Sequence, residues 1–392
     1  MKEDFPIFKD SALVYLDSAA TAQKPQSVID AISHFYAAEY GTVHRAVYKL
    51  AAHSTEKYNA VREKVRQFLN AEHREEIVFT KSTTEALNLI AATFPFQPGD
   101  EILISEMEHH SNIVPWQLAC ARTGAQLKVI PISDTGEILI DAYKKLLLPR
   151  TKLVSVAHIS NVLGTLNPIA EMAALAHAHG AKIVVDGAQS VAHLPVDVQK
   201  LDVDFFAFSG HKAYGPNGIG VLYGKKTLLE MLPPYQGGGD MVETVTFEKT
   251  TYQKPPLKFE AGTPQIAEVI GLGAALDYLN RIGLSKIGAH EHKLLQEATQ
   301  KLLEIPGLRI LGTAPNKSAI ISFVIEGIHP LDLGTLLDVR GIAVRTGHHC
   351  AQPLLRRFGL NAATRVSFGI YNTSEDIGAL IRALKEILIL LR

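Results

Sequence analysis

Short apolar segments alternate with helical segments through most of the first 260 residues, and this alternation limits the chain to a small set of folds. The order of alternating strands and helices favours a mostly parallel sheet that is covered by helices on both faces. The predicted strands are almost continuously apolar, which is typical of strands buried on both faces. They span residues 77–80, 101–105, 127–131, 153–158, 182–186 and 205–209, with helices between them over, for example, residues 84–92, 115–123 and 170–179.

Residues 232–264 interrupt this pattern with clustered prolines and glycines. The pattern beyond them predicts a strand over residues 320–325 and helices over residues 265–281, 286–304, 330–340 and 375–391. A chain of 392 residues has room for two or three domains. We therefore expect an α/β protein with two domains. Residues 16–265 would form a large domain around the mostly parallel sheet, and residues 1–15 with 266–392 a smaller α+β domain.

Composition excludes several classes of function. Lys and Arg number 39 and Asp and Glu number 40, a net charge of −1, so we expect no nucleic-acid partner. No run of 18 apolar residues occurs, so we expect no membrane span. The first residues, Met1-Lys-Glu-Asp-Phe-Pro6, contain two acids and no apolar stretch, which is not typical of a signal peptide. Two cysteines, Cys120 and Cys350, cannot build a disulfide scaffold, which favours a reducing, cytoplasmic location.

Nucleotide and metal motifs do not explain the remaining pattern. Gly237-Gly238-Gly239 lacks the Gly-Lys-Ser/Thr ending of a P-loop, and no Gly-x-Gly-x-x-Gly follows the first strand. His290-Glu291-His292 lies in a helical pattern, where residues two apart face different ways, so a surface face is expected. His348, His349 and Cys350 could bind a metal, but no second ligand cluster accompanies them. We therefore expect no metal site.

Side chains at predicted strand ends fit a pyridoxal phosphate site. This cofactor needs a lysine for its aldehyde, an acid at its ring nitrogen, a flat side chain on its face and donors for its phosphate. Lys212 follows the strand over residues 205–209, where burial would activate its amine. Asp186 ends the strand over residues 182–186, at the sheet edge where ligands bind, and Gln189 could donate to the ring's phenolic oxygen. A surface lysine and a helix-capping aspartate are the alternatives.

Further motifs supply the phosphate and ring contacts. Ser82-Thr83-Thr84-Glu85 is a capping-box pattern at the start of a helix, whose N-terminus could bind a phosphate. Ser209 and His211 could add donors, and His109 could stack on the ring and move protons. Each residue also has an ordinary structural explanation. Their coincidence at consecutive strand ends indicates one cofactor site.

Cys350 lies in the polar segment Arg345-Thr-Gly-His-His-Cys-Ala-Gln-Pro353. A lone cysteine among basic groups is expected to be reactive, and a helix is predicted to begin near Pro353. Cys120, in an apolar helical pattern, is interpreted as a buried and inert thiol. Arg365 is suited to bind a carboxylate through two hydrogen bonds, with a surface salt bridge as the alternative.

With these motifs the chain resembles the group II cysteine desulfurases, the SUF-type branch that includes selenocysteine lyase-like enzymes, within the class V aminotransferase superfamily. The resemblance runs from Tyr15 to Ser367, and the loop around Cys350 is similar to the short cysteine loop of group II. Ala213 and Gln265 depart from the pattern that we expect. The most specific segments are Met107-Glu-His-His110, Val185-Asp-Gly-Ala-Gln189, Phe208-Ser-Gly-His-Lys-Ala-Tyr-Gly-Pro216, Phe259-Glu-Ala-Gly-Thr-Pro264 and Arg345-Thr-Gly-His-His-Cys-Ala351.

The resemblance implies a fold-type I pyridoxal phosphate enzyme that acts as a homodimer. Such an enzyme removes sulfur from L-cysteine, giving L-alanine and a persulfide on Cys350 for iron–sulfur cluster assembly. L-selenocysteine is a second substrate that the resemblance allows, and a SUF-type sulfur-acceptor protein is the implied partner. The alternatives are another class V aminotransferase without sulfur chemistry, a non-catalytic interaction protein and a metal-binding module.

The resemblance also implies a role for each candidate residue. Lys212 would bond to the cofactor aldehyde and Asp186 would pair with the pyridine nitrogen. Gln189 would contact the phenolic oxygen, and His109 would stack on the ring. The phosphate donors would be Thr83, Thr84, Ser209, His211 and, from the other subunit, Thr263. The substrate pocket would contain Arg365, bound to the substrate carboxylate, with Asn161, His44 and Arg345.

Overall fold

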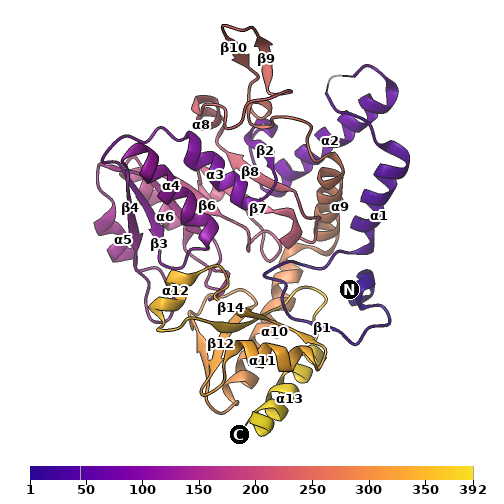
Figure 1. The fold of residues 1–392 in the computed structure, drawn as a ribbon, viewed down its shortest axis with the longest axis vertical. Helices are drawn as coiled ribbons and strands as arrows, with labels where there is room; N and C mark the ends of the chain where they lie inside the picture. Colours follow the sequence, from indigo (N-terminus) through magenta and orange to yellow (C-terminus); the bar gives the residue numbers. More distant parts are fainter. Residues whose placement is uncertain (45, 392) are drawn as a thin grey trace.

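Two β-sheets, one of seven strands and one of four, organise the chain (Figure 1). The computed structural model describes residues 1–44 and 46–391, so the last residue of the predicted small domain, Arg392, lies outside it. The large sheet has the spatial order β2 (Ile77–Thr80), β8 (Gly220–Gly224), β7 (Phe205–Ser209), β6 (Lys182–Asp186), β5 (Thr151–Ala157), β3 (Glu101–Ser105) and β4 (Gln126–Ile130).

The predicted mostly parallel sheet is confirmed. Strands β4, β3, β5, β6 and β7 run parallel to their neighbours, whereas β8 pairs antiparallel with both β7 and β2. The pattern did not predict β8, a five-residue segment that glycines bracket. Strand β4 lies at the edge, and only its last residue, Ile130, is buried. The prediction of strands buried on both faces is therefore wrong for β4.

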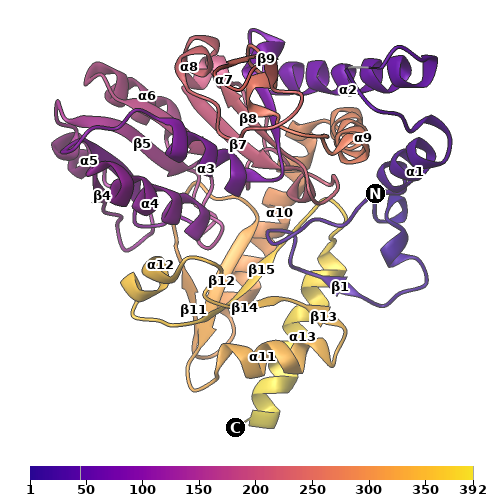
Figure 2. The same ribbon diagram turned by 45° about the horizontal axis from the view of Figure 1, so that its top comes forward.

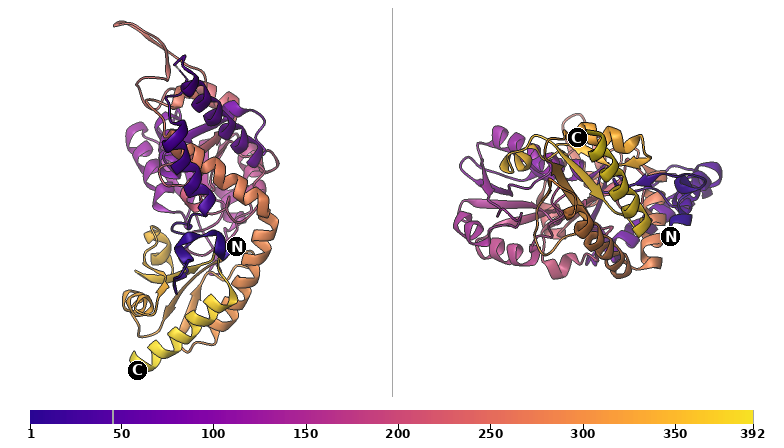
Figure 3. Two further views of the ribbon diagram at one scale, coloured as in Figure 1. Left: turned by 90° about the vertical axis from the view of Figure 1, so that its right-hand side faces the viewer. Right: turned by 90° about the horizontal axis from the view of Figure 1, so that it is seen from below.

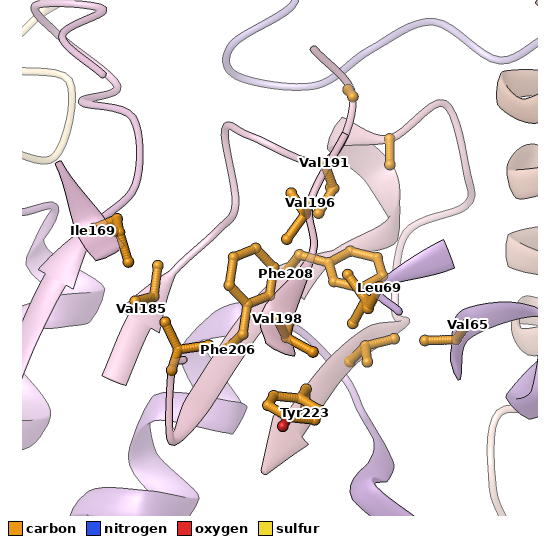
Figure 4. Packing of buried hydrophobic residues seen from close by; sticks show 14 of the residues in the cluster. Val65, Leu69, Ile169, Val185, Val191, Val196, Val198, Phe206, Phe208 and Tyr223 are labelled. Carbon is orange, nitrogen blue, oxygen red and sulfur yellow. The ribbon is translucent and has the colours of Figure 1, made fainter. Parts of the chain in front are cut away.

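Helices cover both faces of the large sheet (Figure 2). Successive side chains of a strand point to opposite faces, so they pack onto different helix layers. Val184 packs with a cluster that includes α3 and α4, whereas Val185 packs with α6 and α2 on the opposite face (Figure 4). The helices of this part are α1 (Gln26–His34), α2 (Lys49–Phe68), α3 (Thr83–Thr93), α4 (Val114–Thr123), α5 (Ile140–Leu146), α6 (Ile169–Ala178), α7 (Val198–Leu201), α8 (Lys226–Met231) and α9 (Ile266–Ile282).

The smaller sheet lies beside the large part (Figure 3). It is antiparallel and has its own apolar core. Its strands, in spatial order, are β11 (Leu308–Leu311), β12 (Ile320–Ile325), β15 (Ala363–Ser367) and β14 (Arg345–Gly347). Its core includes side chains from α10 (Leu284–Leu303), α11 (Pro330–Asp338) and α13 (Ser374–Leu391), and α12 (Gln352–Arg357) follows β14. The predicted strand over residues 320–325 and the predicted helix start near Pro353 are confirmed.

Two short strand pairs and several single turns complete the described chain. Strand β1 (Val14–Tyr15) pairs with β13 (Ile342–Ala343). Strands β9 (Val242–Val245) and β10 (Thr250–Tyr252) form a hairpin that protrudes from the large part, within the segment that we predicted to be irregular (Figure 1). The turns are η1 (Lys2–Asp4), η2 (Pro6–Phe8), η3 (Phe35–Glu39), η4 (Arg74–Glu76), η5 (His110–Asn112), η6 (Gly210–Lys212) and η7 (Leu257–Phe259).

The predicted domain limits remain a prediction. The segments next to these limits pack partly against the larger apolar core and partly against the smaller one. Val14 packs with the small core, whereas Phe5 and Phe8 pack with the larger one. Helix α9, directly after residue 265, contributes Leu272 and Leu276 to the larger core. Helix α10 contains His290-Glu291-His292, which we predicted to lie on a surface face. This prediction is wrong for Glu291. This residue is buried, and its Oε2 lies 2.7 Å from His193 Nδ1. No helix among the described residues is long and apolar enough to cross a membrane.

Candidate active site

A cavity of about 200 Å³ opens at the carboxyl ends of β6 and β7. It collects side chains from the large sheet and from the loop between β14 and α12. Of the predicted site residues, His44 and Thr263 do not line it. Those that do are Thr83, Thr84, His109, Asn161, Asp186, Gln189, Ser209, His211, Lys212, Arg345, Cys350 and Arg365.

Lys212 enters this cavity from η6, immediately after β7. Burial lowers the pKa of its amine to about 8, and the carboxylate of Asp186 opposes this shift. A lysine with such a pKa is partly neutral close to physiological pH. Its amine can therefore act as a nucleophile or as a base.

Asp186 ends β6 and faces Lys212 across the cavity floor. Its Oδ1 accepts a 2.9 Å hydrogen bond from the amide of Ala188. Burial raises the pKa of this carboxyl, and the charge of Lys212 lowers it. The next residue is Gly187, where a Cβ would lie 2.0 Å from Cζ of Phe206, so only glycine fits at this turn.

Gln189 completes this wall of the cavity. Its Nε2 donates a 2.7 Å hydrogen bond to the carbonyl of Ala19, which fixes the amide group. An amide nitrogen carries two hydrogens, so one remains for a ligand. The predicted donor role is compatible with this arrangement.

The N-terminus of α3 also lines the cavity. Ser82 caps this helix, since its Oγ accepts a 3.3 Å hydrogen bond from the amide of Glu85. The capping box is only half formed, because the carboxylate of Glu85 accepts from the amide of Lys81 and not from that of Ser82. Gly220 of β8 permits this close approach, because a Cβ there would lie 2.6 Å from the Ser82 backbone. Free amides at a helix start attract anions.

Hydroxyl groups surround this helix start. Ser209 Oγ lies 2.8 Å from Thr83 Oγ1 and accepts a hydrogen bond from the Thr83 amide at 2.8 Å. Thr84 Oγ1 lies 2.7 Å from Ser111 Oγ. The sequence reasoning missed Ser111, although it follows the singled-out segment that ends at His110. The helix amides and these hydroxyls can together bind a phosphate.

His211 extends the same polar region. Its Nδ1 lies 3.1 Å from Thr21 Oγ1. Burial, followed by the positive charge of Lys212, lowers the pKa of this imidazole to about 4. His211 is therefore neutral near pH 7 and can offer one donor.

His109 lines the cavity above Lys212 and Asp186. Burial, followed by the charge of Lys212, lowers the pKa of this ring to about 3, so it is neutral at physiological pH. Its Nδ1 accepts a 3.0 Å hydrogen bond from the Ser111 amide, so in the neutral ring the proton lies on Nε2. His109 can stack and donate from Nε2, which leaves Lys212 as the better base.

A buried carboxyl that the sequence reasoning missed directly precedes His109 in the chain. Glu108 is fully buried, and its Oε2 accepts a 2.6 Å hydrogen bond from Asn112 Nδ2. Its Oε1 accepts from the amide of Ala157 at 3.1 Å and pairs with the hydroxyl of Ser105. Burial raises the pKa of Glu108 to about 7. Its place beside the singled-out His109 was the available signal.

The loop that carries Cys350 closes the cavity from the small sheet. Its backbone is strained, since His349 and Cys350 have φ of 52° and 55°, values that side chains disfavour. The amide of His110 donates a 2.7 Å hydrogen bond to the carbonyl of Cys350, which ties the loop to the large part. Arg345 Nη2 lies 3.7 Å from Cys350 Sγ. This contact places a positive charge beside the thiol.

His349 turns away from the loop surface and is buried, with its Nε2 3.1 Å from the carbonyl of Ala363. The alternative hypothesis of a metal site made of His348, His349 and Cys350 is therefore wrong in its choice of His349. His110, His348 and Cys350 are the residues whose potential ligand atoms lie within 4.8 Å of one another.

Arg365 is buried in the cavity wall, and its predicted alternative as a surface salt bridge is wrong. Its Nη2 lies 2.8 Å from Asp17 Oδ1, and its Nη1 donates a 3.0 Å hydrogen bond to the carbonyl of Asn161. Asn161 in turn donates to the carbonyl of His349 at 2.8 Å. Arg365 Nε is buried and has no hydrogen-bond partner among the described residues. Each Nη carries a second hydrogen beyond these two contacts, which a carboxylate could accept.

His44 and Thr263 lie elsewhere in the chain. His44 lines a separate cavity together with Arg62 and Tyr252, so the place in the substrate pocket that the resemblance implies for it stays a prediction. Thr263 is exposed, as suits a residue that we expected to serve another subunit.

Comparison with known proteins identifies the family. Residues 14–380 match the family described as Aminotransferase class-V, which is most of the chain. The chain belongs to this family. Within it the chain is similar to cysteine desulfurases, as the resemblance indicated. One from Synechococcus elongatus is 55% identical over 99% of this chain, and a probable one from Vibrio cholerae is 50% identical over 97% of this chain and 95% of its own length.

The solved structures agree with this family assignment. The crystal structure of the cysteine desulfurase CsdA from Escherichia coli has a TM-score of 0.94 and 44% sequence identity, and it covers 100% of this chain and 98% of its own. The chain spans 58–64% of the length of the first three curated relatives, including 63% of the Synechococcus elongatus protein.

Proposed function

We propose that the protein is a pyridoxal phosphate-dependent cysteine desulfurase that converts L-cysteine to L-alanine and leaves the sulfur as a persulfide on Cys350. One observation carries this proposal. A thiol, Cys350, and a lysine–carboxylate pair, Lys212 and Asp186, line the same cavity although they come from different sheets. An aminotransferase needs the pair but has no use for the thiol. The names of the relatives support the same activity.

The residues of the cavity fit the proposed cofactor. Lys212 is a buried amine for the aldehyde, and Asp186 is a buried carboxylate for the pyridine nitrogen. The start of α3 with Thr83, Thr84 and Ser209 suits the phosphate, together with His211. Gln189 keeps one amide hydrogen for the phenolic oxygen, and His109 would stack on the ring.

Pyridoxal phosphate, when bound, supplies an electron-poor ring that draws electrons from the Cα of an amino acid. The residues of this chain would do the rest. Lys212 would remove the Cα proton, because its lowered pKa makes the neutral amine available. Asp186 would hold a proton at the pyridine nitrogen. His109 would exclude water from one face and donate from Nε2.

Sulfur transfer would take place at Cys350. The thiolate attacks the sulfur of the substrate, a sulfur–sulfur bond forms, and the Cβ–S bond breaks with its electron pair left on the substrate carbons. Protonation of those carbons then gives L-alanine, so L-cysteine and the Cys350 thiol become L-alanine and a Cys350 persulfide. The guanidinium of Arg345 lies beside the attacking sulfur, since its Nη2 is 3.7 Å from Sγ.

Arg365 would position the substrate by binding its carboxylate. Its Nη atoms are already bound to Asp17 and Asn161, which fixes the plane of the guanidinium. The second hydrogen on each Nη would then donate to the carboxylate. Asn161 would link this contact to the Cys350 loop through the carbonyl of His349.

Further parts of the proposal concern partners. A second copy of this chain would supply Thr263 to the phosphate site and His44 to the substrate pocket. Neither residue lines the cavity of its own chain. A SUF-type acceptor protein would take the persulfide sulfur for iron–sulfur cluster assembly. Action on L-selenocysteine and a cytoplasmic location stay predictions.

A single assay tests the proposal. Wild type and Cys350→Ser, each loaded with cofactor, receive L-cysteine and a thiol reductant, and sulfide and L-alanine are measured together. We expect equal amounts from wild type, none from Cys350→Ser and the same visible cofactor band in both. Cys120→Ser is the matched control, because Cys120 lies on α4 outside the cavity, and it should retain full activity. Loss of the cofactor band in Cys350→Ser would contradict the proposed division of roles.

The alternative class V aminotransferase gives a different result. It would exchange the amino group between L-alanine and a keto acid, and it would release no sulfide from L-cysteine. The Cys350→Ser variant would then be as active as wild type. The position of Cys350 in the cavity favours the desulfurase.

A further inference from the structure

Two imidazoles that the proposed reaction does not use lie beside the thiol of Cys350. His110, His348 and Cys350 each offer a potential ligand atom, and these atoms lie within 4.8 Å of one another. The ring centroids of His110 and His348 are 5.4 Å apart. His110 belongs to η5 of the large part and the other two to the loop before α12. The fold therefore assembles this group from two distant segments.

Both rings direct a nitrogen lone pair at the backbone of this loop. His110 Nε2 accepts a 3.1 Å hydrogen bond from the amide of Gln352, and His348 Nδ1 accepts one of 3.1 Å from the amide of Cys350. A metal would take these lone pairs and release both amides to water. Because His348 is exposed and His110 and Cys350 are partly exposed, this exchange costs little. We expect reversible binding and not a permanent structural ion.

The donor atoms of the group suit a borderline-soft cation, since two imidazole nitrogens and a thiol sulfur are ligands that Zn²⁺ takes. In each ring one nitrogen already accepts an amide hydrogen bond, so that nitrogen carries a lone pair. The guanidinium of Arg345, whose Nη2 lies 3.7 Å from Sγ, repels a cation. This repulsion limits the affinity and again favours a reversible site.

We propose that His110, His348 and Cys350 form a reversible binding site for a divalent metal such as Zn²⁺. Two imidazoles and one thiolate, with a water in the fourth position, are ligands that Zn²⁺ takes in tetrahedral sites. Binding replaces the thiol proton with the metal and transfers no electrons. The bound thiolate cannot attack a sulfur atom, so Zn²⁺ inhibits sulfur transfer. The inhibition rests on the proposed function, whereas the binding does not.

Cobalt is the probe that tests the site. Co²⁺ is titrated into the cofactor-loaded protein, kept reduced with a phosphine, and its absorption in the red is recorded, where the cofactor does not absorb. We expect bands of tetrahedral, thiolate-bound Co²⁺ that saturate at one ion per chain and disappear when Zn²⁺ is added. His348→Ala and Cys350→Ser should weaken binding by about tenfold or more. His292→Ala, which removes an exposed histidine on α10, is the control and should bind as wild type does.

Two results would overturn the proposal. One is the absence of red bands from the wild type. The other is unchanged Co²⁺ affinity in both His348→Ala and Cys350→Ser, with far-ultraviolet circular dichroism confirming that they are folded. Alanine production is measured separately, with a chelator and then with added Zn²⁺. A protein that makes alanine without binding Co²⁺ refutes the metal site. A protein that binds Co²⁺ without making alanine or sulfide refutes the desulfurase.

Discussion

The guanidinium of Arg365 and the carboxylate of Asp17 form an ion pair of 2.8 Å across 348 residues of sequence. Arg365 is almost completely buried, and Asp17 is 20% exposed. The pair joins the segment after β1 to strand β15 of the small sheet. It therefore neutralises the one arginine that we propose to bind the substrate carboxylate.

Asp17→Asn should weaken both folding and substrate binding, because it leaves the buried guanidinium without its counter-charge. We expect a loss of about 2 kcal/mol in the free energy of unfolding, less than for a fully buried pair because Asp17 is 20% exposed. The Michaelis constant for L-cysteine should rise. Urea unfolding and steady-state kinetics measure the two effects. Asp277→Asn, which breaks an exposed pair with Lys64, should change stability by less than about 1 kcal/mol. Equal losses in the two variants would refute the argument.

The cofactor-free protein should become more stable relative to Lys212→Met as the pH rises from about 8 to about 10.5. The folded-state pKa of Lys212 is lowered, so in this window the unfolded chain binds a proton that the folded chain does not. Below pH 8 the buried charge of Lys212 destabilises the folded protein to its full extent. This destabilisation disappears above the pKa of Lys212 in the unfolded chain. The difference between the two proteins should shift by about 3 kcal/mol. Denaturant unfolding at several pH values measures it, and a flat difference would show that Lys212 titrates normally.

Glu108 should produce the opposite pH dependence. Its folded-state pKa is raised from 4.5 to about 7, so between these values the folded chain retains a proton that the unfolded chain has lost. Wild type should therefore lose about 3 kcal/mol of stability relative to Glu108→Gln as the pH rises through this window. Paired unfolding curves at pH 4.5 and 8 give the value. Because the variant keeps a side chain of similar size, a constant offset between the proteins reports lost hydrogen bonds, and only the slope tests the pKa.

Gly220→Ala should weaken binding of pyridoxal phosphate. The new Cβ would lie 2.6 Å from the backbone of Ser82, so the start of α3 must move away from the cavity. We expect the dissociation constant of the cofactor to rise about tenfold or more, since a phosphate contact depends on fixed helix amides. Fluorescence titration of the cofactor-free protein measures it. Gly237→Ala is the matched control, because nothing lies within 4 Å of its new Cβ. A normal constant in Gly220→Ala would remove α3 from the phosphate site.

The alternation of apolar strands and helices was enough to predict the large sheet, because strands buried on both faces have a simple sequence pattern. Strand β6 was predicted with its correct limits, and Asp186 was placed at its carboxyl end. Strand β8 was not predicted, because it has only five residues, of which the first and last are glycines, and so carries little periodicity. The hairpin of β9 and β10 was missed because its residues are mostly exposed and polar.

The candidate site divides in the same way. Residues at strand ends, such as Lys212 and Asp186, could be placed from local sequence, because the topology of a parallel sheet brings them together. Contacts across the chain could not. The ion pair of Asp17 with Arg365, and the hydrogen bond that Glu108 accepts from Ala157, depend on tertiary packing that no spacing reveals. The approach of His110 to Cys350 joins two segments that lie 240 residues apart.

The loop that carries Cys350 leaves β14 at Gly347 and enters α12 at Gln352, so no strand register depends on its length. Residues can be inserted or removed between these two points without shifting either sheet. Lys212 and Asp186 would stay where the large sheet holds them. Variation in this loop can therefore change how far the thiol reaches, while the residues proposed to act at Cα keep their places. In the proposed reaction, the step at Cα and the step at sulfur would then be free to evolve at different rates.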